Sequence, residues 1–491
     1  MYDCTIIGCG ITGAAAAYLL SHYSLRLLML EAANDVANGS TKANSAILHA
    51  GFDPEPGSLM ARANVRGVEM AAEICRRLDV PRLNCGALVL AFSPDDQHTI
   101  RELYARGLAN GVPGLRLLSA QEARQSEPYL ADTVTGALLA PSSSIVDPWE
   151  YALAMAETAV KNGLALGLGR AVRRIVRPDS PSGKDYFELT DSQGQSYQSR
   201  FVINAAGVHS DQVHAMIGGH NFHIHPVRGQ YFLLDKNAGR TCSHTLFQCP
   251  TAAGKGVLVS PTVHGNLIIG PDAEAVADPD NTATTAEALE YVRRMALRSL
   301  NNIPFGENIR NFAGVRAQSD RPDFIVEASP QSSRFINLAG IKSPGLSAAP
   351  ALAEMALDLL AQAGLPLKRR SDYDDSRRRT RFRYLTPAQQ SELIAADPRY
   401  GHVVCRCETI TEGEIVAALH GPIPPRSLDA VKRHCNAGSG RCQGSFCGPR
   451  IHEIIARELG LPYEAVTQND AGSYIVTAPT KGTGSKGVTA C

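Results

Sequence analysis

The chain has 491 residues, which is too many for one hydrophobic core, so two or three domains are expected. Its composition is 44% hydrophobic and 20% charged, as in globular proteins, and its 48 basic and 48 acidic residues give no charge excess that would indicate nucleic-acid binding. The twelve cysteines do not form the dense framework of a small secreted protein. We expect a protein of the reducing cytoplasm, without a secretory leader or a membrane span.

The first predicted elements form a strand–helix–strand unit. A short buried strand is expected over Tyr2–Ile7, an alanine-rich helix over Ile11–Leu20, and a second strand over Arg26–Glu31. This order is typical of a dinucleotide-binding unit. The alternative is an ordinary βαβ unit with a glycine-rich turn.

The residues between these elements favour the dinucleotide. Gly8 permits a tight turn, Gly10 lets a pyrophosphate approach the backbone, and Gly13 allows the helix to pack closely on the strand. The helix N-terminus offers N–H groups to phosphates, and Glu31 is placed to accept ribose hydroxyls. The predicted nucleotide-binding residues of this unit are Gly8, Gly10, Ile11, Thr12, Gly13 and Glu31.

Segments further along the chain indicate which dinucleotide is bound. Gly39–Ser45 is small and polar, which suits a lining for a pyrophosphate and a flavin ring. With Ala46–Gly51, Asn204–Gly207 and Gly340–Leu346, it resembles the flavin-dependent D-amino-acid-oxidase-like superfamily, especially its glycerol-3-phosphate and L-2-hydroxyglutarate oxidising branches. The resemblance covers about residues 1 to 365 in order. It implies that FAD is the cofactor and that these residues bind it: Ser40, Thr41, Asn44, Ser45, Ala206, Gly207, Gly340, Gly345, Leu346 and Ser347.

The same resemblance implies an α/β fold, in which a Rossmann-like FAD-binding domain is interleaved with an antiparallel-sheet substrate domain. The second insert carries strand-like stretches at Gly229–Leu234, Gly256–Ser260 and Asn266–Gly270, which would roof the flavin. We expect these boundaries: residues 1–80, 150–215 and 311–365 for the FAD-binding domain, 81–149 and 216–310 for the substrate domain, 366–399 for a linker, 400–462 for a small α-rich iron–sulfur domain, and 463–491 for a closing segment and tail.

The candidate catalytic residues suit the oxidation of an anionic alcohol. A neutral imidazole is the usual acceptor of a hydroxyl proton, and His49 matches a histidine of the glycerol-3-phosphate oxidase group. Lys255, flanked by glycines, and Ser343 match residues that line the active site of the resembling oxidases. Arg316 resembles the arginine that grips a substrate anion, and Arg228 is a weaker candidate. The alternatives are a structural role for His49 and solvated or structural charges for Lys255 and Arg316.

Two further features bear on the substrate pocket. Lys342 stands where the related motif usually has an acidic residue, which favours a more anionic substrate. His220, His223 and His225 invite a metal site, but no cysteine or carboxylate nearby completes a ligand shell, so we interpret them as surface or core histidines.

The C-terminal part holds a second redox signature. An arginine-rich stretch, Lys368–Arg383, is interpreted as a solvated surface connector, and a helix is expected over Glu412–Leu419. Cysteines that can hold an inorganic cluster flank this helix, and they are Cys405, Cys407, Cys442 and Cys447. Their spacing fits neither common ferredoxin pattern.

This cysteine pattern resembles the bacterioferritin-associated-ferredoxin-like module, which binds a two-iron two-sulfur cluster and is also fused to anaerobic glycerol-3-phosphate dehydrogenases. We expect nearby cations to favour reduction of the cluster, and they are Arg406, Lys432, Arg433, Arg441 and Arg450. Structural zinc is the alternative, since four cysteines also suit it. The fifth cysteine, Cys435, has no counterpart among the ligands of the resembling module.

The resemblance therefore implies an FAD-dependent dehydrogenase that oxidises an anionic α-hydroxy substrate, sn-glycerol 3-phosphate first among them, and passes electrons through the cluster. The acceptor would be a quinone, a flavoprotein or a partner subunit, and any peripheral membrane association would occur through that partner. Two rivals stay open. One is an enzyme for L-2-hydroxyglutarate, another 2-hydroxy acid or an amino acid, and the other is a non-catalytic electron-transfer subunit.

Overall fold

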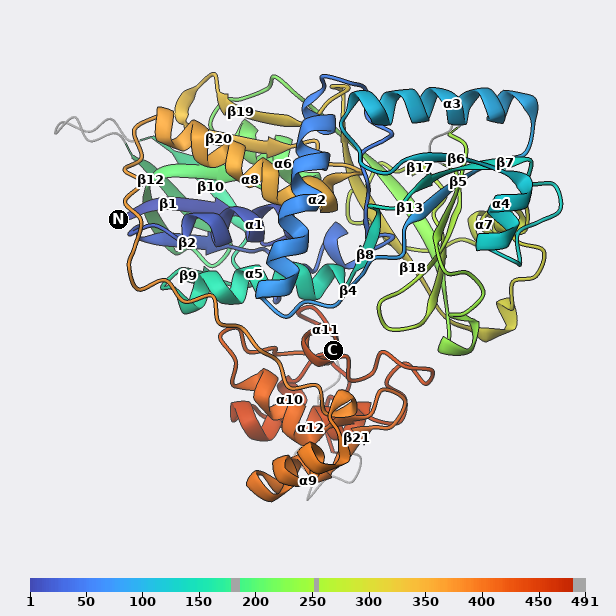
Figure 1. Cartoon of the computed structure of the whole chain (residues 1–491). Coiled ribbons are helices and arrows are strands. Elements are labelled where there is room, and N and C mark those ends of the chain that lie inside the picture. Colours follow the sequence, from blue (N-terminus) through green and yellow to red (C-terminus); the bar gives the residue numbers. More distant parts are fainter. Residues whose placement is uncertain (178–185, 251–255, 480–491) are drawn as a thin grey trace, which may run out of the picture. The chain divides into compact units, whose positions relative to one another are not determined.

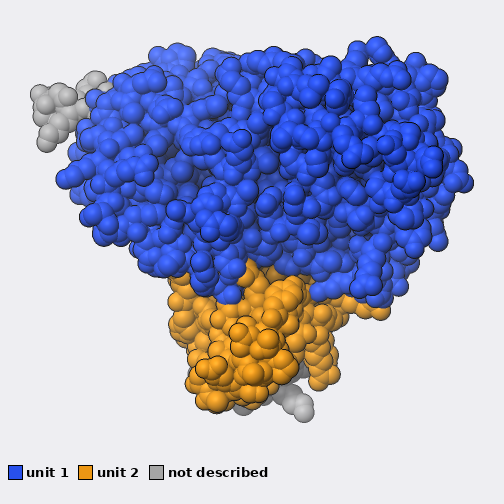
Figure 2. Space-filling view, viewed as in Figure 1, with its two compact units in different colours: residues 1–379 blue, residues 380–491 orange. Residues whose placement is uncertain are grey.

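The structure, a computed structural model, describes residues 1–177, 186–250 and 256–479. The chain divides into two compact units, Met1–Arg379 and Thr380–Cys491, which Figure 2 colours separately. The predicted linker, residues 366–399, is divided between them. Within the described ranges, no helix combines the length and the apolar character that crossing a bilayer requires.

The first sheet of the first unit is built around parallel strands. It has the order β10-β11-β12-β1-β2-β9, with β20 pairing with β12 and β19 pairing with β20. The strands β1 (Tyr2–Ile7) and β2 (Leu27–Leu30) are buried apolar runs, as expected for parallel strands that are covered on both faces. The remaining bounds are β9 Ala165–Gly167, β10 Val172–Val176, β11 Phe187–Asp191, β12 Ser196–Asn204, β19 Ile325–Ser329 and β20 Ser332–Ala339.

The helices α1 and α8 pack on this sheet, and α5 and α2 pack on them (Figure 1). The bounds are α1 Ile11–Leu20, α2 Leu59–Arg77, α5 Pro148–Lys161 and α8 Gly345–Gln362. The helix α1 contacts both α5 and α8, and almost all of its residues are buried, which explains its alanine-rich composition. At the α2–α8 contact, a Cβ on Gly67 would lie 2.1 Å from the carbonyl oxygen of Ser347. The backbones of the two helices therefore approach as closely as a glycine allows.

The second sheet of the first unit is mostly antiparallel, as predicted for the substrate domain. It has the order β17-β13-β16-β15-β14-β5-β7-β6, and β18 also pairs with β13. One pair, β5 with β14, is parallel. The strand bounds are β5 Ala87–Ala91, β6 Arg116–Ser119, β7 Gly136–Ala140, β13 Ile224–Leu234, β14 Thr245–Gln248, β15 Leu258–Pro261, β16 Leu267–Gly270, β17 Glu274–Ala275 and β18 Asn308–Ser319.

Two apolar clusters cover the faces of this second sheet. One includes Leu88 and Leu246 with Val292 of helix α7 (Ala286–Ala296), and the other includes Val89 and Phe247 with Leu103 of helix α3 (Pro94–Ala109). The two clusters hold successive residues of the same strands because side chains alternate between the faces. A separate small sheet, in the order β3-β8-β4, joins Ile47–Leu48, Ser144–Val146 and Arg82–Leu83.

The arginine-rich stretch differs from the predicted solvated connector in its central part. Arg377 donates to Glu157 at 2.7 Å and to Glu150 at 3.3 Å, and Arg379 pairs with Glu150 at 3.0 Å. The Glu150 side chain is 0% exposed and lies in α5. These arginines therefore stabilise a buried carboxylate of the first unit, and for them the sequence prediction is wrong.

The second unit is small and α-rich. It consists of a hairpin, β21 (Val403–Cys405) and β22 (Ile410–Thr411), and of α9 Pro387–Ala396, α10 Glu412–Leu419, α11 Leu428–Cys435 and α12 Gly448–Leu459. Its own apolar core includes Val404, Ile415, Val431 and Ile454. The helix α10 has the predicted bounds, and a capping box between Thr411 and Glu414 explains why it begins there.

Candidate functional site

The glycine turn after β1 requires glycine at two of its positions. Gly8 has φ +100°, and a Cβ there would lie 2.5 Å from the carbonyl oxygen of Ala205. A Cβ on Gly13 would lie 2.0 Å from the carbonyl oxygen of Gly8. Gly10 is the N-cap of α1 and provides no side-chain cap. The turn thus presents the N-terminus of α1 as a cradle that fits a pyrophosphate.

Glu31 stabilises this turn from the end of β2. Its Oε2 atom accepts from the Cys9 N–H at 2.6 Å, and its Oε1 atom accepts from the Ala33 N–H at 2.9 Å. Burial raises the pKa of Glu31, and the two N–H donors oppose that rise. Its predicted contact with a ribose stays a prediction, and the structure adds this second role.

The other predicted FAD segments lie at the same edge of the first sheet. Gly8 follows β1, Ala206 and Gly207 follow β12, and Gly340 follows β20, and these three strands are parallel neighbours. Ligands of open α/β sheets bind at the carboxyl ends of such strands. Gly345 begins α8, which carries the predicted residues Leu346 and Ser347 in its first turn.

The segment of residues 40–45 connects this edge to the second sheet. The Thr41 hydroxyl accepts from the Ile11 N–H at 2.9 Å, and the Ser40 hydroxyl donates to the carbonyl of Val315 on β18. Asn44 donates to the Thr41 carbonyl at 2.7 Å, and the Ser45 hydroxyl lies 3.3 Å from the Tyr231 hydroxyl on β13. The predicted FAD-lining segment is therefore fixed between the glycine turn and the sheet that was expected to roof the flavin.

His49 and Ser343 are brought together. The Nε2 atom of His49 and the Ser343 hydroxyl form a hydrogen bond of 3.4 Å. The His49 N–H donates to the Ser347 hydroxyl at 2.7 Å, and its carbonyl accepts from the buried Asn64 amide at 2.9 Å. The backbone of His49 is thus held on both sides, and the contact with Ser343 orients its ring.

Arg316 lies on the face of the β13–β18 pair that meets the 40–45 segment. Arg316 pairs with Val227, and the next two pairs on the same face are Gly314 with Gly229 and Phe312 with Tyr231. On this face a Cβ on Gly314 would lie 1.9 Å from the Ala43 carbonyl oxygen. The 40–45 segment therefore touches the second sheet at Gly314, the neighbour of Arg316 on the same face of β18.

The guanidinium of Arg316 extends across Gly229. A Cβ on Gly229 would lie 2.3 Å from Nη2 and 2.9 Å from Cζ of Arg316. Both Nη atoms donate to the carbonyl oxygen of Asp272, at the long distance of 3.4 Å. A neutral carbonyl at this distance is a weak partner for a guanidinium, so Arg316 keeps donor capacity for an anion.

The remaining candidates fall in different places. Arg228 lies on the opposite face of β13 and is buried, with Glu274 at 2.7 Å and Asn281 at 2.9 Å. Lys255 lies outside the described residues. Lys342 is part of the turn between β20 and α8, where its N–H donates to the Gly340 carbonyl at 3.0 Å. Sequence reasoning missed Gly229 and Tyr231, although strand alternation along 229–234 places both on one face.

The four cysteines of the second unit form two pairs. The Cys447 thiol donates to Cys405 and thereby lowers the pKa of Cys405 to about 6, and the Gly438 N–H also donates to Cys405 at 3.4 Å. Cys407 and Cys442 are likewise hydrogen-bonded to each other. In the described part of the chain, no three of His, Cys, Asp or Glu gather as ligands of one metal ion. Two thiol pairs fit a two-iron two-sulfur cluster, which takes two thiolates per iron.

The predicted cations around these cysteines have specific partners. Arg406 lies over the Phe446 ring, 4.6 Å from its centroid, and Lys432 donates to Gln443 at 3.0 Å. Cys435 is buried in α11, where its thiol donates to the Val431 carbonyl at 3.2 Å. Cys435 thus has a partner within its own helix, and its omission from the ligands stays a prediction.

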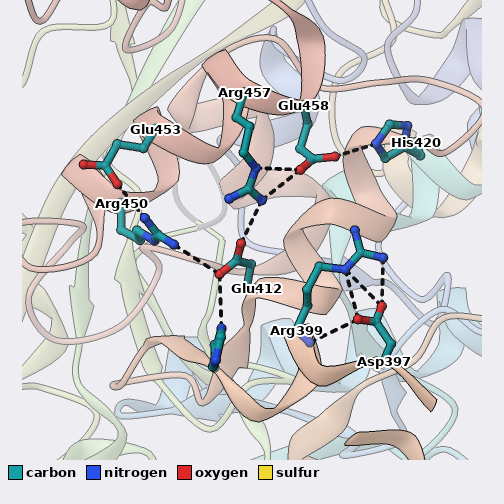
Figure 3. A network of polar contacts seen from close by, with 9 residues as sticks. Asp397, Arg399, Glu412, His420, Arg450, Glu453, Arg457 and Glu458 are labelled. Atoms are coloured by element: carbon teal, nitrogen blue, oxygen red, sulfur yellow. Dashed lines mark hydrogen bonds and ion pairs between the residues drawn. The ribbon is translucent and has the colours of Figure 1, made fainter. Parts of the chain in front are cut away.

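One carboxylate connects the elements that carry the cysteines (Figure 3). Glu412, at the start of α10, accepts from Arg457 at 2.7 Å and from Arg450 at 3.4 Å, and both arginines belong to α12. Its side chain is 6% exposed. Burial by itself raises the pKa of Glu412. The two arginines lower the pKa by a larger amount, so the net shift is downward. Glu412 thus fixes α12, whose N-cap is Cys447, against the hairpin that carries Cys405.

The chain is similar to known redox proteins. A family described as FAD dependent oxidoreductase matches residues 3–359, and one described as BFD-like 2Fe-2S binding domain matches residues 403–457. A glycerol 3-phosphate dehydrogenase from Caloramator mitchellensis is 44% identical over 98% of this chain and 99% of that protein. A glycerol 3-phosphate oxidase from Mycoplasma genitalium is 28% identical over 76% of this chain and 97% of that protein.

Among solved structures, the chain is similar to the dithionite-reduced L-alpha-glycerophosphate oxidase from Mycoplasma pneumoniae with FAD bound. The TM-score is 0.72 at 28% identity, and the match covers 76% of this chain and 97% of that one. The match with the 2Fe-2S family agrees with the two thiol pairs and not with structural zinc.

Replacement of Glu412 by glutamine is expected to destabilise the second unit. The amide keeps the size of the side chain but removes the charge that holds Arg450 and Arg457, so the free energy of unfolding should fall by about 1–3 kcal/mol. Because the folded-state pKa of Glu412 is lowered, its contribution should be present at neutral pH and lost on acidification. Denaturant unfolding, followed by the visible absorbance of the cluster, measures both effects.

The matched control for this prediction is Asp397→Asn. Asp397 pairs with Arg399 at 2.8 Å in the same unit, but that pair is partly exposed. It should lower the free energy of unfolding much less than Glu412→Gln does, because solvent screens an exposed ion pair. Equal effects of the two substitutions would contradict the role assigned to Glu412.

Proposed function

The chain belongs to the FAD-dependent oxidoreductase family and carries a BFD-like 2Fe-2S binding domain, and on this premise we propose that it oxidises sn-glycerol 3-phosphate to dihydroxyacetone phosphate. The observation that carries the proposal is the similarity, over nearly the whole of both chains, to a protein named glycerol 3-phosphate dehydrogenase. The site geometry supports it, because a base candidate and a cation with donor capacity both adjoin the 40–45 segment.

The bound cofactors and the side chains have separate tasks. FAD, when bound, supplies the acceptor for an electron pair, and the 2Fe–2S cluster supplies a one-electron carrier. The residues that would hold them are the glycine turn with the 40–45 segment, and the four cysteines. The rest of the chemistry is proton transfer and orientation of the substrate.

His49 is proposed to accept the hydroxyl proton of the substrate. Oxidation of a secondary alcohol needs this proton to leave as the C–H bond breaks, and a neutral imidazole is suited to take it near pH 7. The hydrogen bond between Nε2 and the Ser343 hydroxyl directs the ring, and the two backbone contacts of His49 keep it in place. Ser343 would thus orient the base and line the substrate pocket.

Arg316 is proposed to bind the phosphate group, with Lys255 contributing a second cation. A guanidinium presents two parallel N–H donors to phosphate or carboxylate oxygens. Arg316 makes long contacts to one carbonyl, and it lies on the face of the second sheet that meets the FAD-lining segment. The contribution of Lys255 is inferred from its sequence neighbourhood alone.

The electrons are proposed to leave through the cluster to a quinone, a flavoprotein or a partner subunit. A membrane-bound acceptor would bring the chain to the membrane peripherally. The reducing cytoplasm is the proposed location, because none of the cysteines in the described residues forms a disulfide.

A substrate panel under anaerobic conditions tests the proposal. Flavin absorbance is followed after addition of sn-glycerol 3-phosphate, L-2-hydroxyglutarate, glycerol and a set of amino acids. Rapid bleaching by sn-glycerol 3-phosphate alone is expected. Faster bleaching by L-2-hydroxyglutarate or an amino acid would favour that rival substrate, and reduction by dithionite alone would favour a non-catalytic electron-transfer subunit.

Replacement of His49 by glutamine should slow flavin reduction by sn-glycerol 3-phosphate roughly 100- to 10,000-fold, because the proton acceptor is lost. Stopped-flow absorbance measures the rate, and the flavin content of the purified protein shows whether FAD is still bound. His98, an exposed histidine paired with Glu102 on α3, provides the control substitution, which should leave the rate unchanged.

Replacement of Gly229 by alanine should displace the Arg316 guanidinium, because the new methyl group would lie 2.3 Å from Nη2. We expect kcat/KM for sn-glycerol 3-phosphate to fall roughly 10- to 100-fold, mainly through KM, while the rate of flavin reduction by glycerol, which carries no phosphate for Arg316 to bind, stays unchanged. In an Arg316→Met background the same change should have a smaller effect, because the contact with the guanidinium is removed and that of the new methyl group with Pro271 Cβ, at 2.8 Å, remains. Gly306→Ala, at a site with open space around the glycine, is the control.

A further inference from the structure

A buried carboxylate adjoins the cysteines of the second unit. Glu408 follows Cys407 directly, and its side chain is 3% exposed. A Cβ on Gly440 would lie 2.3 Å from Cβ of Cys407 and 3.1 Å from Oε1 of Glu408. The carboxylate therefore lies between the hairpin that carries Cys405 and Cys407 and the glycine-rich loop that leads to Cys442.

Such a charge opposes the reduction of a cluster held by these cysteines. Four thiolates give a 2Fe–2S cluster a net negative charge, and reduction adds one electron. A nearby carboxylate in a buried place raises the energy of the reduced form, because its field is poorly screened there. The effect on the reduction potential depends on what compensates this carboxylate.

Arg383 provides that compensation. Its Nη1 atom donates to Oε2 of Glu408 at 2.6 Å and to the Glu408 carbonyl at 3.4 Å. Its Nη2 atom donates to the Tyr384 hydroxyl at 2.6 Å, and the guanidinium lies over the Tyr384 ring, 4.6 Å from its centroid. The Arg383 side chain is 17% exposed. The ion pair is thus largely removed from solvent and held in one geometry.

The segment that carries Arg383 is attached to the iron–sulfur domain by its own contacts. Arg383 belongs to a short 3₁₀ helix, Phe382–Tyr384. The Phe382 N–H donates to Oε1 of Glu414 at 3.1 Å, its carbonyl accepts from Gln390 at 3.1 Å, and its ring is buried. This segment lies about twenty residues before residue 403, where the matched 2Fe-2S domain begins.

We propose that Arg383, supplied from outside the matched domain, is a positioning and charge-compensating residue of the 2Fe–2S site. It acts through Glu408: it fixes the carboxylate between the two cysteine-bearing segments and neutralises its charge. In the proposal, the reduction potential of the cluster depends on both members of this pair. Loss of the Arg383 cation lowers the potential, and loss of the Glu408 carboxylate raises it.

A redox titration of the full-length holoprotein, followed by the electron paramagnetic resonance signal of the reduced cluster, tests the proposal. Arg383→Met should lower the reduction potential, because it removes the positive charge that lies against Glu408. Glu408→Gln should raise it, and the double variant should lie close to the wild type. Arg383→Lys keeps the charge and should lie closer to the wild type than Arg383→Met.

The control is Arg399→Met, which removes a cation of the same unit from the partly exposed pair with Asp397 (Figure 3). Iron and acid-labile sulfide are measured for each variant, because a purely structural role would change cluster content and not the potential of the clusters that remain. The proposal would be overturned if Arg383→Met left the reduction potential unchanged. It would also be overturned if Arg399→Met lowered the potential as much as Arg383→Met does. A double variant whose potential does not return towards that of the wild type would also contradict the dependence on a pair.

Discussion

The contact between strand β18 and the 40–45 segment determines the geometry of the first unit's site. Gly314 admits the Ala43 carbonyl to a place that any side chain would fill, and the Ser40 hydroxyl donates to the neighbouring Val315 carbonyl. The same segment caps the N-terminus of α1 through Thr41 and leads directly to His49. The predicted base, the predicted phosphate ligand and the nucleotide turn are therefore positioned by one peptide of ten residues. Because protein interiors are close-packed, a displacement of this ten-residue segment would also displace the base, the phosphate ligand and the nucleotide turn.

Local features of the sequence predicted local features of the structure. The strand Tyr2–Ile7 and the helices Ile11–Leu20 and Glu412–Leu419 have the expected bounds, because the glycine turn and the capping box act within a few residues. The orientation of Arg316 could not be predicted this way. It depends on the register that places Arg316 opposite Val227, and the two residues are far apart in the chain. Strand alternation assigns Gly229 to one face of β13, but only the register places it beside the Arg316 guanidinium.

The same limit explains the arginine-rich stretch. A run of arginines between two prolines is typical of a solvated connector, and nothing near it in the sequence indicates that Glu150 is buried. In the second unit the spacing identified the four cysteines but not their pairing. Each thiol pair joins a residue of the hairpin to one of the later loop, Cys405 with Cys447 and Cys407 with Cys442. A cluster bound there would connect the two halves of the module, so cluster binding and folding of this unit are thermodynamically linked.

The pairing of Arg377 and Arg379 with Glu150 also determines where the flavoprotein part of the chain ends. The family match stops at residue 359, and the last helix of the first unit, α8, ends at Gln362. A polypeptide cut at that point would keep every predicted FAD-contacting residue and yet leave the Glu150 carboxylate inside α5 without these two cations. A flavin-binding unit expressed alone would therefore have to extend through Arg379. The segment that follows α8 thus completes the packing of the first unit as well as leading into the second.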